Sequence, residues 1–368
     1  MPVLLERTGP DGVGGAGTAA LFLGAVSGEL GSLWLMSWQS SKRLVAAGLL
    51  VSAVMSLVLI IPQAPAWLML ASSAFRGAGT GVGVVVCSVL VADLASPERR
   101  GRSVGLFGLA LSVPSIALPS IGVALVGAGR TDVAALIGFA GGLVGTWMAL
   151  RLPDHKPPSA KILAHLDTAF HEPGLMAVLG SFVLVSLSFG GVLTFAPIVL
   201  TSNGPASAAV FLLLVGMLRA ASRWFAGLLS DIGRPATVLS AGILLTCLGL
   251  VALALRTSPA VTLIAAVAYG AGFGAVQTSG YLAMIERGGA TPRTTIGALW
   301  SSGIDLGSSI GGALLGASAS QLGYANAFWL VPAAVALALP LALLAGRMSI
   351  SDGAAAGAAP SVNRNSKG

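Results

Sequence analysis

Apolar runs of about twenty residues, the length needed to cross a bilayer, follow one another along most of this chain. Short polar segments separate them. Each run is expected to form one transmembrane helix, and the eleven runs are Ala19–Met36, Leu44–Ile61, Ala66–Leu94, Val104–Val126, Val133–Leu150, Leu175–Leu200, Ala206–Leu229, Ala236–Leu255, Val261–Ile285, Thr295–Ala319 and Tyr324–Ala345. Because helices satisfy their own backbone hydrogen bonds in lipid, the pattern predicts an all-α membrane protein.

Composition and charge agree with this class. Hydrophobic residues make up 55% of the chain and charged residues only 9%, whereas soluble domains carry about 25% charged residues. The net charge of +7 does not point to nucleic acid, since the basic residues lie in short loops without interleaved aromatic residues. If alternate loops are assigned to opposite sides of the membrane, one side holds 14 Lys and Arg residues and the other side holds 3. The positive-inside rule therefore places the side with 14, which includes the C-terminus, in the cytoplasm.

The longest polar interruption, Arg151–Pro173, separates five apolar runs from six. Its middle, Ala160–Phe170, is expected to form a short amphipathic helix on the membrane surface. The histidines of the linker are either solvated or form a metal cluster, and they are His155, His165 and His171. The predicted domains are an N-terminal bundle (1–150), a cytoplasmic linker (151–173), a C-terminal six-helix bundle (174–346) and a disordered cytoplasmic tail (347–368).

Short sequences recur between the two halves in the same order. The pairs are AAGLL at Ala46–Leu50 with SAGIL at Ser240–Leu244, RGAGTG at Arg76–Gly81 with YGAGFG at Tyr269–Gly274, and RSVG at Arg102–Gly105 with TTIG at Thr294–Gly297. Their offsets are 194, 193 and 192 residues. Nearly constant offsets over consecutive helices predict two parallel repeats related by a pseudo-twofold axis.

A short polar turn, RWFAGLLSDIGRP at Arg223–Pro235, joins two of the apolar runs and is expected to hold them side by side. Its glycines should allow close backbone approach. The turn resembles the signature loop of the major facilitator superfamily. That loop usually has one more residue between its aspartate and its second glycine, where this chain has only Ile232. The resemblance implies two bundles of six helices and a gating loop formed by Arg223, Gly227, Asp231, Gly233 and Arg234.

Charged side chains within the apolar runs are expensive to insert and therefore mark functional positions or buried partners. Arg76 opens the glycine-rich RGAGTG sequence, and Asp305 lies in the middle of its helix. We expect one of them to couple transport to protons, and the alternative is that each only pairs within the packing. Arg219, four residues before Arg223, and Glu29 are further intramembrane charges.

Four residues at a spacing of four form one stripe along a predicted helix: Tyr269, Phe273, Gln277 and Tyr281. Such a stripe suits the wall of an amphiphilic ligand site or the packing of a core. The resemblance favours a cavity wall, because this helix matches one of the family's cavity-lining helices. Phe189 and Thr194 belong to another helix of that class and complete the expected wall.

The resemblance implies a secondary transporter that moves a small molecule by alternating access in the plasma membrane, as a monomer and without a cofactor. Pro119 and Gly122 match part of a motif of the family's exporters, which favours proton-coupled efflux. Import of a nutrient by the same fold and a degenerate, non-transporting protein remain as alternatives. A membrane-embedded enzyme is disfavoured because all three histidines lie in the linker.

The repeat leaves the first half one helix short, and the counterpart that is missing is the first. Met1–Gly9 resembles the outer end of such a helix. We therefore expect the upstream reading frame to encode about twenty further apolar residues, one membrane span. Without that helix, Glu29 should be poorly shielded from lipid.

Changing Asp231 to Asn should lower transport while leaving expression near normal, because the substitution removes a fixed charge at the end of a helix in a short gating turn. The measurement is transport by the variant at matched protein levels. Undiminished transport would remove the gating role from Asp231.

Overall fold

The computed structural model describes residues 4–6, 13–61, 63–94, 100–154, 166–200, 205–232 and 235–345, which contain helices and no strands. The first half contains α2 (Val13–Leu35), α3 (Ser41–Ser56) with the short η1 (Leu57–Ile60), α4 (Ala66–Leu94), α5 (Arg100–Gly127) and α6 (Thr131–Ala149). The second half contains α8 (Leu166–Phe170), α9 (Pro173–Val199), α10 (Pro205–Ile232), α11 (Pro235–Leu255), α12 (Pro259–Arg287), α13 (Arg293–Ala327) and α14 (Leu330–Ala336).

Helices cover all eleven apolar runs that the sequence predicts, which confirms the all-α class. Eight helices in the described part are long and apolar enough to cross a membrane. A ninth span is a bent pair, Thr295–Ala327 with Leu330–Ala345, whose two parts meet at 86°. α13 is itself kinked at Gly323, where φ is +70°. Two predicted helices are thus joined at a position where only glycine is unstrained.

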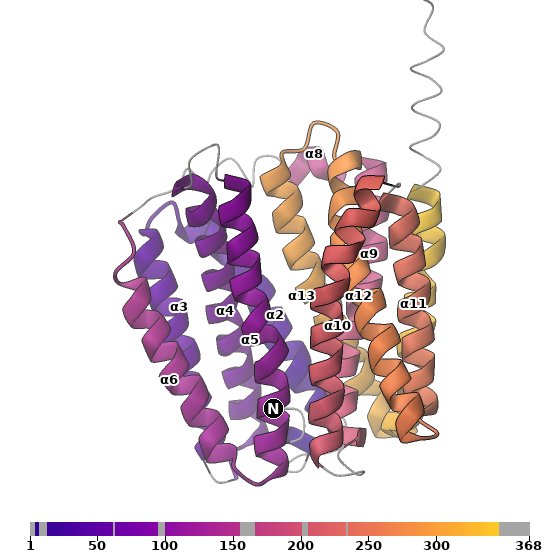
Figure 1. The fold of residues 1–368 in the computed structure, drawn as a ribbon. Helices are drawn as coiled ribbons and strands as arrows, with labels where there is room; N and C mark the ends of the chain where they lie inside the picture. The colour runs from indigo at the N-terminus through magenta and orange to yellow at the C-terminus, as the bar shows by residue number, and fades with distance from the viewer. Residues whose placement is uncertain are drawn as a thin grey trace, which may run out of the picture.

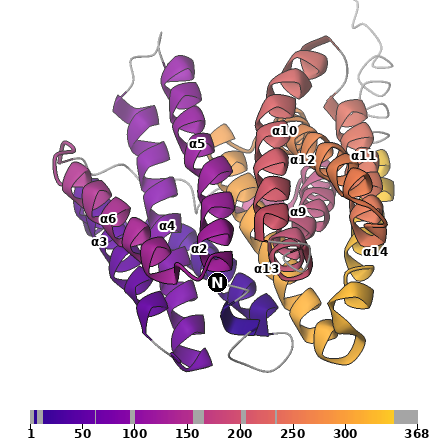
Figure 2. The same cartoon turned by 60° about the horizontal axis from the view of Figure 1, so that its bottom comes forward.

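The helices form two bundles that stand side by side, α2–α6 in one and α9–α14 in the other (Figure 1). α8 lies at the upper end in this view, which is also where the α2–α3 connection lies, and we call it the linker end. Lys42 just after that connection pairs with Asp154 at 3.3 Å. In the view turned by 60° the bundles meet near the end opposite the linker end, and the ribbons of α5 and α10 diverge away from it (Figure 2).

Glycines on one helix of each bundle explain the internal repeat. In α4, Gly77 and Gly81 lie against α2 backbone at Leu21 and Ala25, while Gly79 lies against α3. In α12, at an offset of 193 residues, Gly270 and Gly274 lie against α10, while Gly272 lies against α11. The repeated GAG sequence is therefore a packing motif: alternate glycines let two neighbours approach the same central helix.

The expectation that α10 and α11 pack side by side is wrong. Only residues 233–234 separate them, but both helices pack mainly against α12, and they contact each other much less. Gly227 does not mediate a close approach either, because a Cβ atom added there would meet only Thr278 Cγ2, at 3.9 Å. A short turn fixes where two helices are joined, but the glycines of α12 decide what each helix packs against.

Packing is more extensive in the second bundle. Its buried apolar cluster involves α9–α14, whereas the described clusters of the first bundle are much smaller. α9 sits at the centre of the second bundle and packs along α13. Under the 193-residue offset, α2, α3, α4 and α5 correspond to α10, α11, α12 and α13, and α9 has no counterpart among the described helices. Within its own bundle, α5 makes few contacts.

Adding a methyl group at Gly28 should destabilise the protein, because the new Cβ would lie 2.8 Å from Ala78 Cα on α4. Overpacking of this kind costs about 1–3 kcal/mol. The matched control is Gly31→Ala on the same helix, where a Cβ would meet no atom within 4 Å. Thermal unfolding in detergent should show a lower Tm for Gly28→Ala only, and equal Tm values would contradict the packing role of Gly28.

Candidate functional site

Two helix pairs make most of the contacts between the bundles in the described part of the chain, α2 with α13 and α5 with α10, and α2 also touches α9. We call the first pair the α2–α13 seam and the second the α5–α10 seam. At the α2–α13 seam, Gly15 lies against the backbone of Gly312 and Gly316. One turn further along, the Ser309 hydroxyl donates to the Ala19 carbonyl oxygen at 3.0 Å. Small residues thus allow the two bundles to touch backbone to backbone.

Thr194, expected in a cavity wall, instead joins the bundles. Its side chain is fully buried, and its hydroxyl donates to that of Thr18 on α2 at 2.8 Å. Near the same end, the Tyr324 hydroxyl donates to Glu6 at 2.7 Å. These contacts close the interface at the end opposite the linker end.

Glu29 bonds across the α2–α13 seam nearer the linker end. Ser301 and Ser302 of α13 each donate a hydroxyl to one of its carboxylate oxygens, at 2.7 and 2.8 Å. The residue is only 3% exposed. The expectation that Glu29 would be poorly shielded is therefore wrong, because α13 of the other bundle covers it.

Asp305 lies one turn beyond Ser301 on α13 and is half-buried. Its carboxylate is close enough to Glu29 for their charges to repel. The structure thus brings two acidic residues, one from each bundle, to the same part of the α2–α13 seam. This arrangement disfavours having both carboxylates ionised at once.

The α5–α10 seam carries the opposite charge. Arg219 on α10 donates to the Ser115 hydroxyl on α5 at 3.0 Å, and Gly216 lies against Ile116. The guanidinium carbon of Arg219 also stands 5.1 Å from the ring centre of Phe189 on α9, within cation–π range. One basic residue therefore contacts both bundles.

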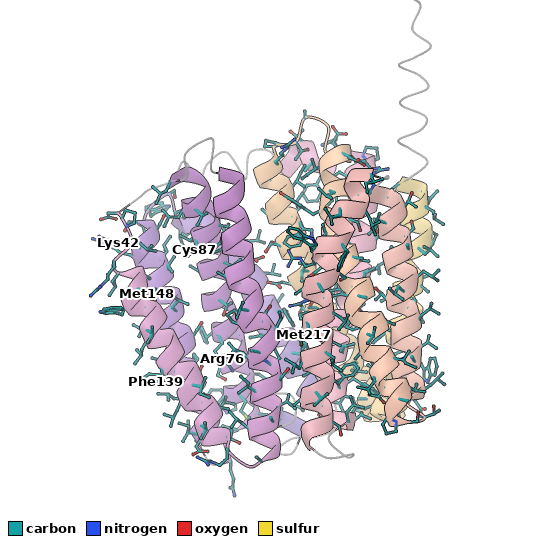
Figure 3. The ribbon with its side chains drawn as sticks, viewed as in Figure 1. Lys42, Arg76, Cys87, Phe139, Met148 and Met217 are labelled. Atoms are coloured by element: carbon teal, nitrogen blue, oxygen red, sulfur yellow. The ribbon has the colours of Figure 1, made fainter. Side chains whose placement is uncertain are left out.

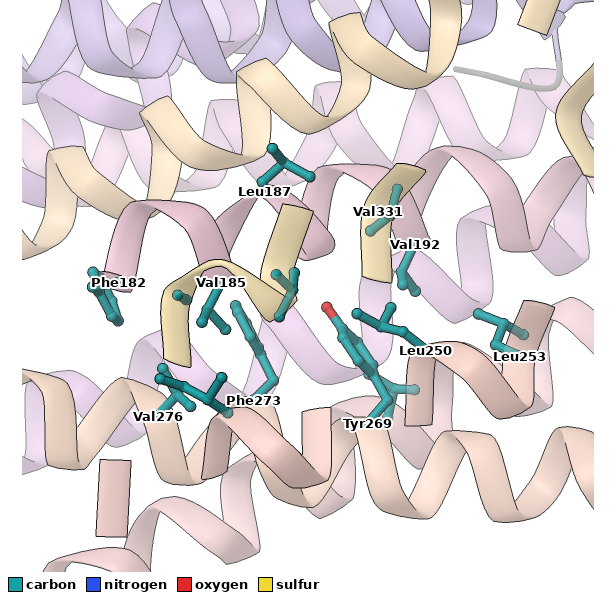
Figure 4. Close-up of a cluster of buried hydrophobic side chains, with 14 of the residues drawn as sticks. Phe182, Val185, Leu187, Val192, Leu250, Leu253, Tyr269, Phe273, Val276 and Val331 are labelled. Atoms are coloured by element: carbon teal, nitrogen blue, oxygen red, sulfur yellow. The ribbon is translucent and has the colours of Figure 1, made fainter. Parts of the chain in front are cut away.

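Most of the expected aromatic wall is packed inside the second bundle in this conformation. Tyr269 and Phe273 are fully buried and Gln277 is 5% exposed. Phe273 stacks between Phe189 and Tyr269, with ring centres 5.4 and 5.7 Å away, and Tyr269 bonds Ser188 at 3.2 Å. Figure 4 shows Tyr269 and Phe273 among apolar side chains from neighbouring helices. Besides Thr194, the half-buried Phe189 reaches the other bundle, through an edge contact with Phe22.

A second aromatic group lies towards the linker end. Trp300 on α13 stacks on Phe182 and contacts Tyr281, and its indole N–H donates to the Gln277 carbonyl oxygen at 3.0 Å. Arg223 stands over the Trp300 ring at 5.9 Å. Arg223 therefore contacts the residue next to Ser301.

Arg76 lies within the first bundle (Figure 3). Its carbonyl oxygen accepts hydroxyl groups from Ser52 and Thr80. Among the described residues, its guanidinium has no hydrogen-bond or ion-pair partner. Arg76 and Asp305 are not brought together: one belongs to α4, the other to the α2–α13 seam.

The gating loop is described only in part. Arg223 and Gly227 lie on α10, and Asp231 lies in its last turn with a side chain outside the described part. Gly233 and Arg234 lie outside the described residues, as do His155 and His165. His171 is exposed and bonds the Asp167 carbonyl oxygen at 2.7 Å.

Sequence reasoning did not single out the hydroxyl groups that bond across the seams: Thr18, Ser115, Ser301 and Ser302. Serine and threonine are common in membrane helices, where most bond their own backbone. The doublet Ser301–Ser302 could have been noticed on α13, but the partner of Ser301, 272 residues earlier, could not.

Comparisons with known proteins agree with this architecture. The model of the Major Facilitator Superfamily matches residues 1–297. Among solved structures, the nucleoside transporter NupG is similar with a TM-score of 0.69 at 15% identity, covering 94% of this chain and 93% of that one. A bacterial homologue of the human lysosomal transporter Spinster, inward-facing and unoccupied, gives 0.71 at 15%, with 95% and 92% covered. None of the curated proteins matches the sequence.

The Thr18–Thr194 bond should contribute a measurable coupling energy between the bundles. We expect a double-mutant cycle with Thr18→Val and Thr194→Val to give about 0.6 kcal/mol, the average for bonds between membrane helices. Unfolding in a mild detergent measures it. The control pairs Thr18→Val with Thr246→Val, whose hydroxyl bonds only its own helix at Gly242. Additive effects in both cycles would contradict a link through Thr194.

Proposed function

This chain belongs to the major facilitator superfamily, and from that premise we propose that it is a secondary transporter that exports a small molecule in exchange for protons. The observation that supports proton coupling best is the half-buried Asp305 on α13, beside Glu29 at the α2–α13 seam. Carboxylates held at membrane depth between moving domains are typical of proton pathways.

In the proposed cycle the two bundles rock about the seams and expose the space between them to either side of the membrane in turn. Asp305 takes up a proton from one side and releases it to the other as its surroundings change with the motion. Arg76 is the second candidate for this coupling, because no described contact neutralises or satisfies its guanidinium. The gating role of Arg223 and Asp231, with Gly227, Gly233 and Arg234, remains part of the proposal.

The linker end faces the cytoplasm in this proposal, because the loops on that side hold 14 of the basic loop residues against 3 on the other. The protein then lies in the plasma membrane with a cytoplasmic C-terminus and works as a monomer. The contacts Thr18–Thr194 and Gly15–Gly316 would close the outer side. The described conformation would correspond to a state closed to the outside.

The proposed substrate is a small molecule with aromatic or amphiphilic character. Phe189 and Tyr281 are the half-buried members of the expected wall, and Arg219 and Arg223 stand against the aromatic groups beside them. Tyr269, Phe273, Gln277 and Thr194 would contact substrate only after the helices rearrange. Nucleosides belong in a first ligand panel, because a structural neighbour is a nucleoside transporter.

Changing Asp305 to Asn should preserve folding and flatten the pH dependence of transport, because an amide side chain neither binds nor releases a proton near neutral pH. Purified protein in vesicles, loaded with a ligand found by thermal shift, measures transport under an imposed pH gradient. Export that is driven by inward proton flow and lost in Asp305→Asn supports the proposal. Uptake in the direction of proton flow would indicate an importer instead. An unchanged pH profile in the variant would transfer the coupling role to Arg76.

A further inference from the structure

Two arginines lie one turn apart on α10, within its membrane span: Arg219 in the middle of the helix and Arg223 nearer the linker end. The exposed apolar side chains Met217 and Trp224 occupy the opposite side of α10. Those side chains face lipid, so the arginines point into the protein. Their positive charges are close enough to repel each other. The α5–α10 seam therefore holds two like charges at membrane depth.

Neither arginine has an acidic partner among the described residues. The ionisable groups that act on the charge of Arg219 are Arg223 and Tyr269, and neither is a carboxylate. A guanidinium carries five N–H donors. Arg219 donates one described hydrogen bond, to the Ser115 hydroxyl at 3.0 Å, and no described hydrogen bond reaches Arg223. Unmet donors and unpaired charges are costly in a membrane, which indicates a ligand that supplies the missing acceptors.

The surroundings of Arg219 offer such a ligand both access and apolar surface. Ser115, the hydrogen-bond partner on α5, is exposed, so the bond lies at an open edge of the seam. The half-buried Phe189 ring on α9 has its centre 5.1 Å from the guanidinium carbon. Phe22 of the other bundle meets that ring edge-on. A ligand beside Arg219 therefore meets positive charge and aromatic side chains together.

We propose that the substrate is a small organic anion with an aromatic body, and that Arg219, assisted by Arg223, binds its anionic group between the bundles. The inference rests on the proposed transport function and names the substrate class. It also gives the two arginines of α10 a role beyond packing against aromatic rings. The aromatic body lies towards Phe189 and Phe22.

The preference for an anion follows from the chemistry of the guanidinium group. A carboxylate accepts two parallel N–H bonds from one guanidinium, and such charge-assisted bonds are about twice as strong as neutral ones. A bound negative charge also offsets the repulsion between Arg219 and Arg223. A primary amide of the same shape accepts through a single oxygen and carries no charge. An amine would add a third positive charge and is disfavoured.

Equilibrium binding to the purified full chain in lipid nanodiscs tests the inference without transport. The probes are benzoate, 2-naphthoate and indole-3-propionate, each compared with its primary amide and with the amine in which an aminomethyl group replaces the carboxylate. Isothermal titration calorimetry near neutral pH gives each Kd, and empty nanodiscs correct for partition into lipid. At least one carboxylate should bind about tenfold or more tightly than its amide, because hydrogen bonds to charged groups are stronger than neutral ones. The amines should bind most weakly.

Substitutions assign the preference to its residues. Arg219→Gln should abolish the difference between carboxylate and amide, and Arg223→Gln should reduce it. Arg219→Lys should keep only part of it, because an ammonium group has the charge but not the planar fork of donors. The matched control is Arg256→Gln in the same bundle. Arg256 also stands over an aromatic ring, that of Phe195 at 5.5 Å, but it donates to the nearby Ala254 carbonyl oxygen, and this variant should keep the preference of the parent.

Carboxylates that all fail to bind, or that bind no better than their amides or amines, would overturn the inference. So would a carboxylate preference that survives in Arg219→Gln. If that variant does not fold, Arg219→Lys decides the question, and an undiminished preference in it counts against Arg219. A carboxylate that binds with the expected pattern but is not exported would refute the proposed export and leave the anion site standing. Export of uncharged compounds without carboxylate binding would do the reverse.

Discussion

Close approach between backbones is the constraint on which this structure depends. Lipid gives apolar helices little reason to associate, so membrane helices pack through small residues and hydrogen bonds. The protein meets this constraint with glycines on α4 and α12, each of which packs against two neighbouring helices of its bundle, and with Gly15, Gly312 and Gly316 where the bundles meet. The same motif thus builds each bundle and joins one to the other. The glycines of the internal sequence repeat are the residues that allow this close packing in both bundles.

Polar chemistry is concentrated where the bundles meet. Glu29 and Asp305 lie at the α2–α13 seam, and Arg219 lies at the α5–α10 seam with a bond to Ser115. Glu29 and Arg219 each bond hydroxyl groups of the other bundle, so the energy of these bonds changes when the bundles move. Membership of a transporter superfamily gives this placement a function, since the family's fold works through movement of two bundles.

Much of the fold follows from sequence because helix length and apolar runs are local properties in lipid. All eleven runs are helical, and the RGAGTG and YGAGFG repeat marks matching helices. Contacts between distant residues do not follow. The stripe Tyr269–Phe273–Gln277 looks like a cavity wall on one helix, but α9 and α11 bury it, and Thr194 bonds Thr18. The shielding of Glu29 was mispredicted for the same reason, because its cover comes from a helix about 270 residues away.

The central claim is that the two bundles rock about their seams. Two spin-label pairs on α5 and α10 test it: Leu111 with Trp224 towards the linker end, and Ile121 with Val210 towards the opposite end, all exposed positions. In nanodiscs, adding a ligand or lowering the pH should shift the protein from one conformation to the other. In that shift one of the two distances should lengthen and the other should shorten. Two distances that stay constant, or that rise and fall together, would contradict alternating access by this protein.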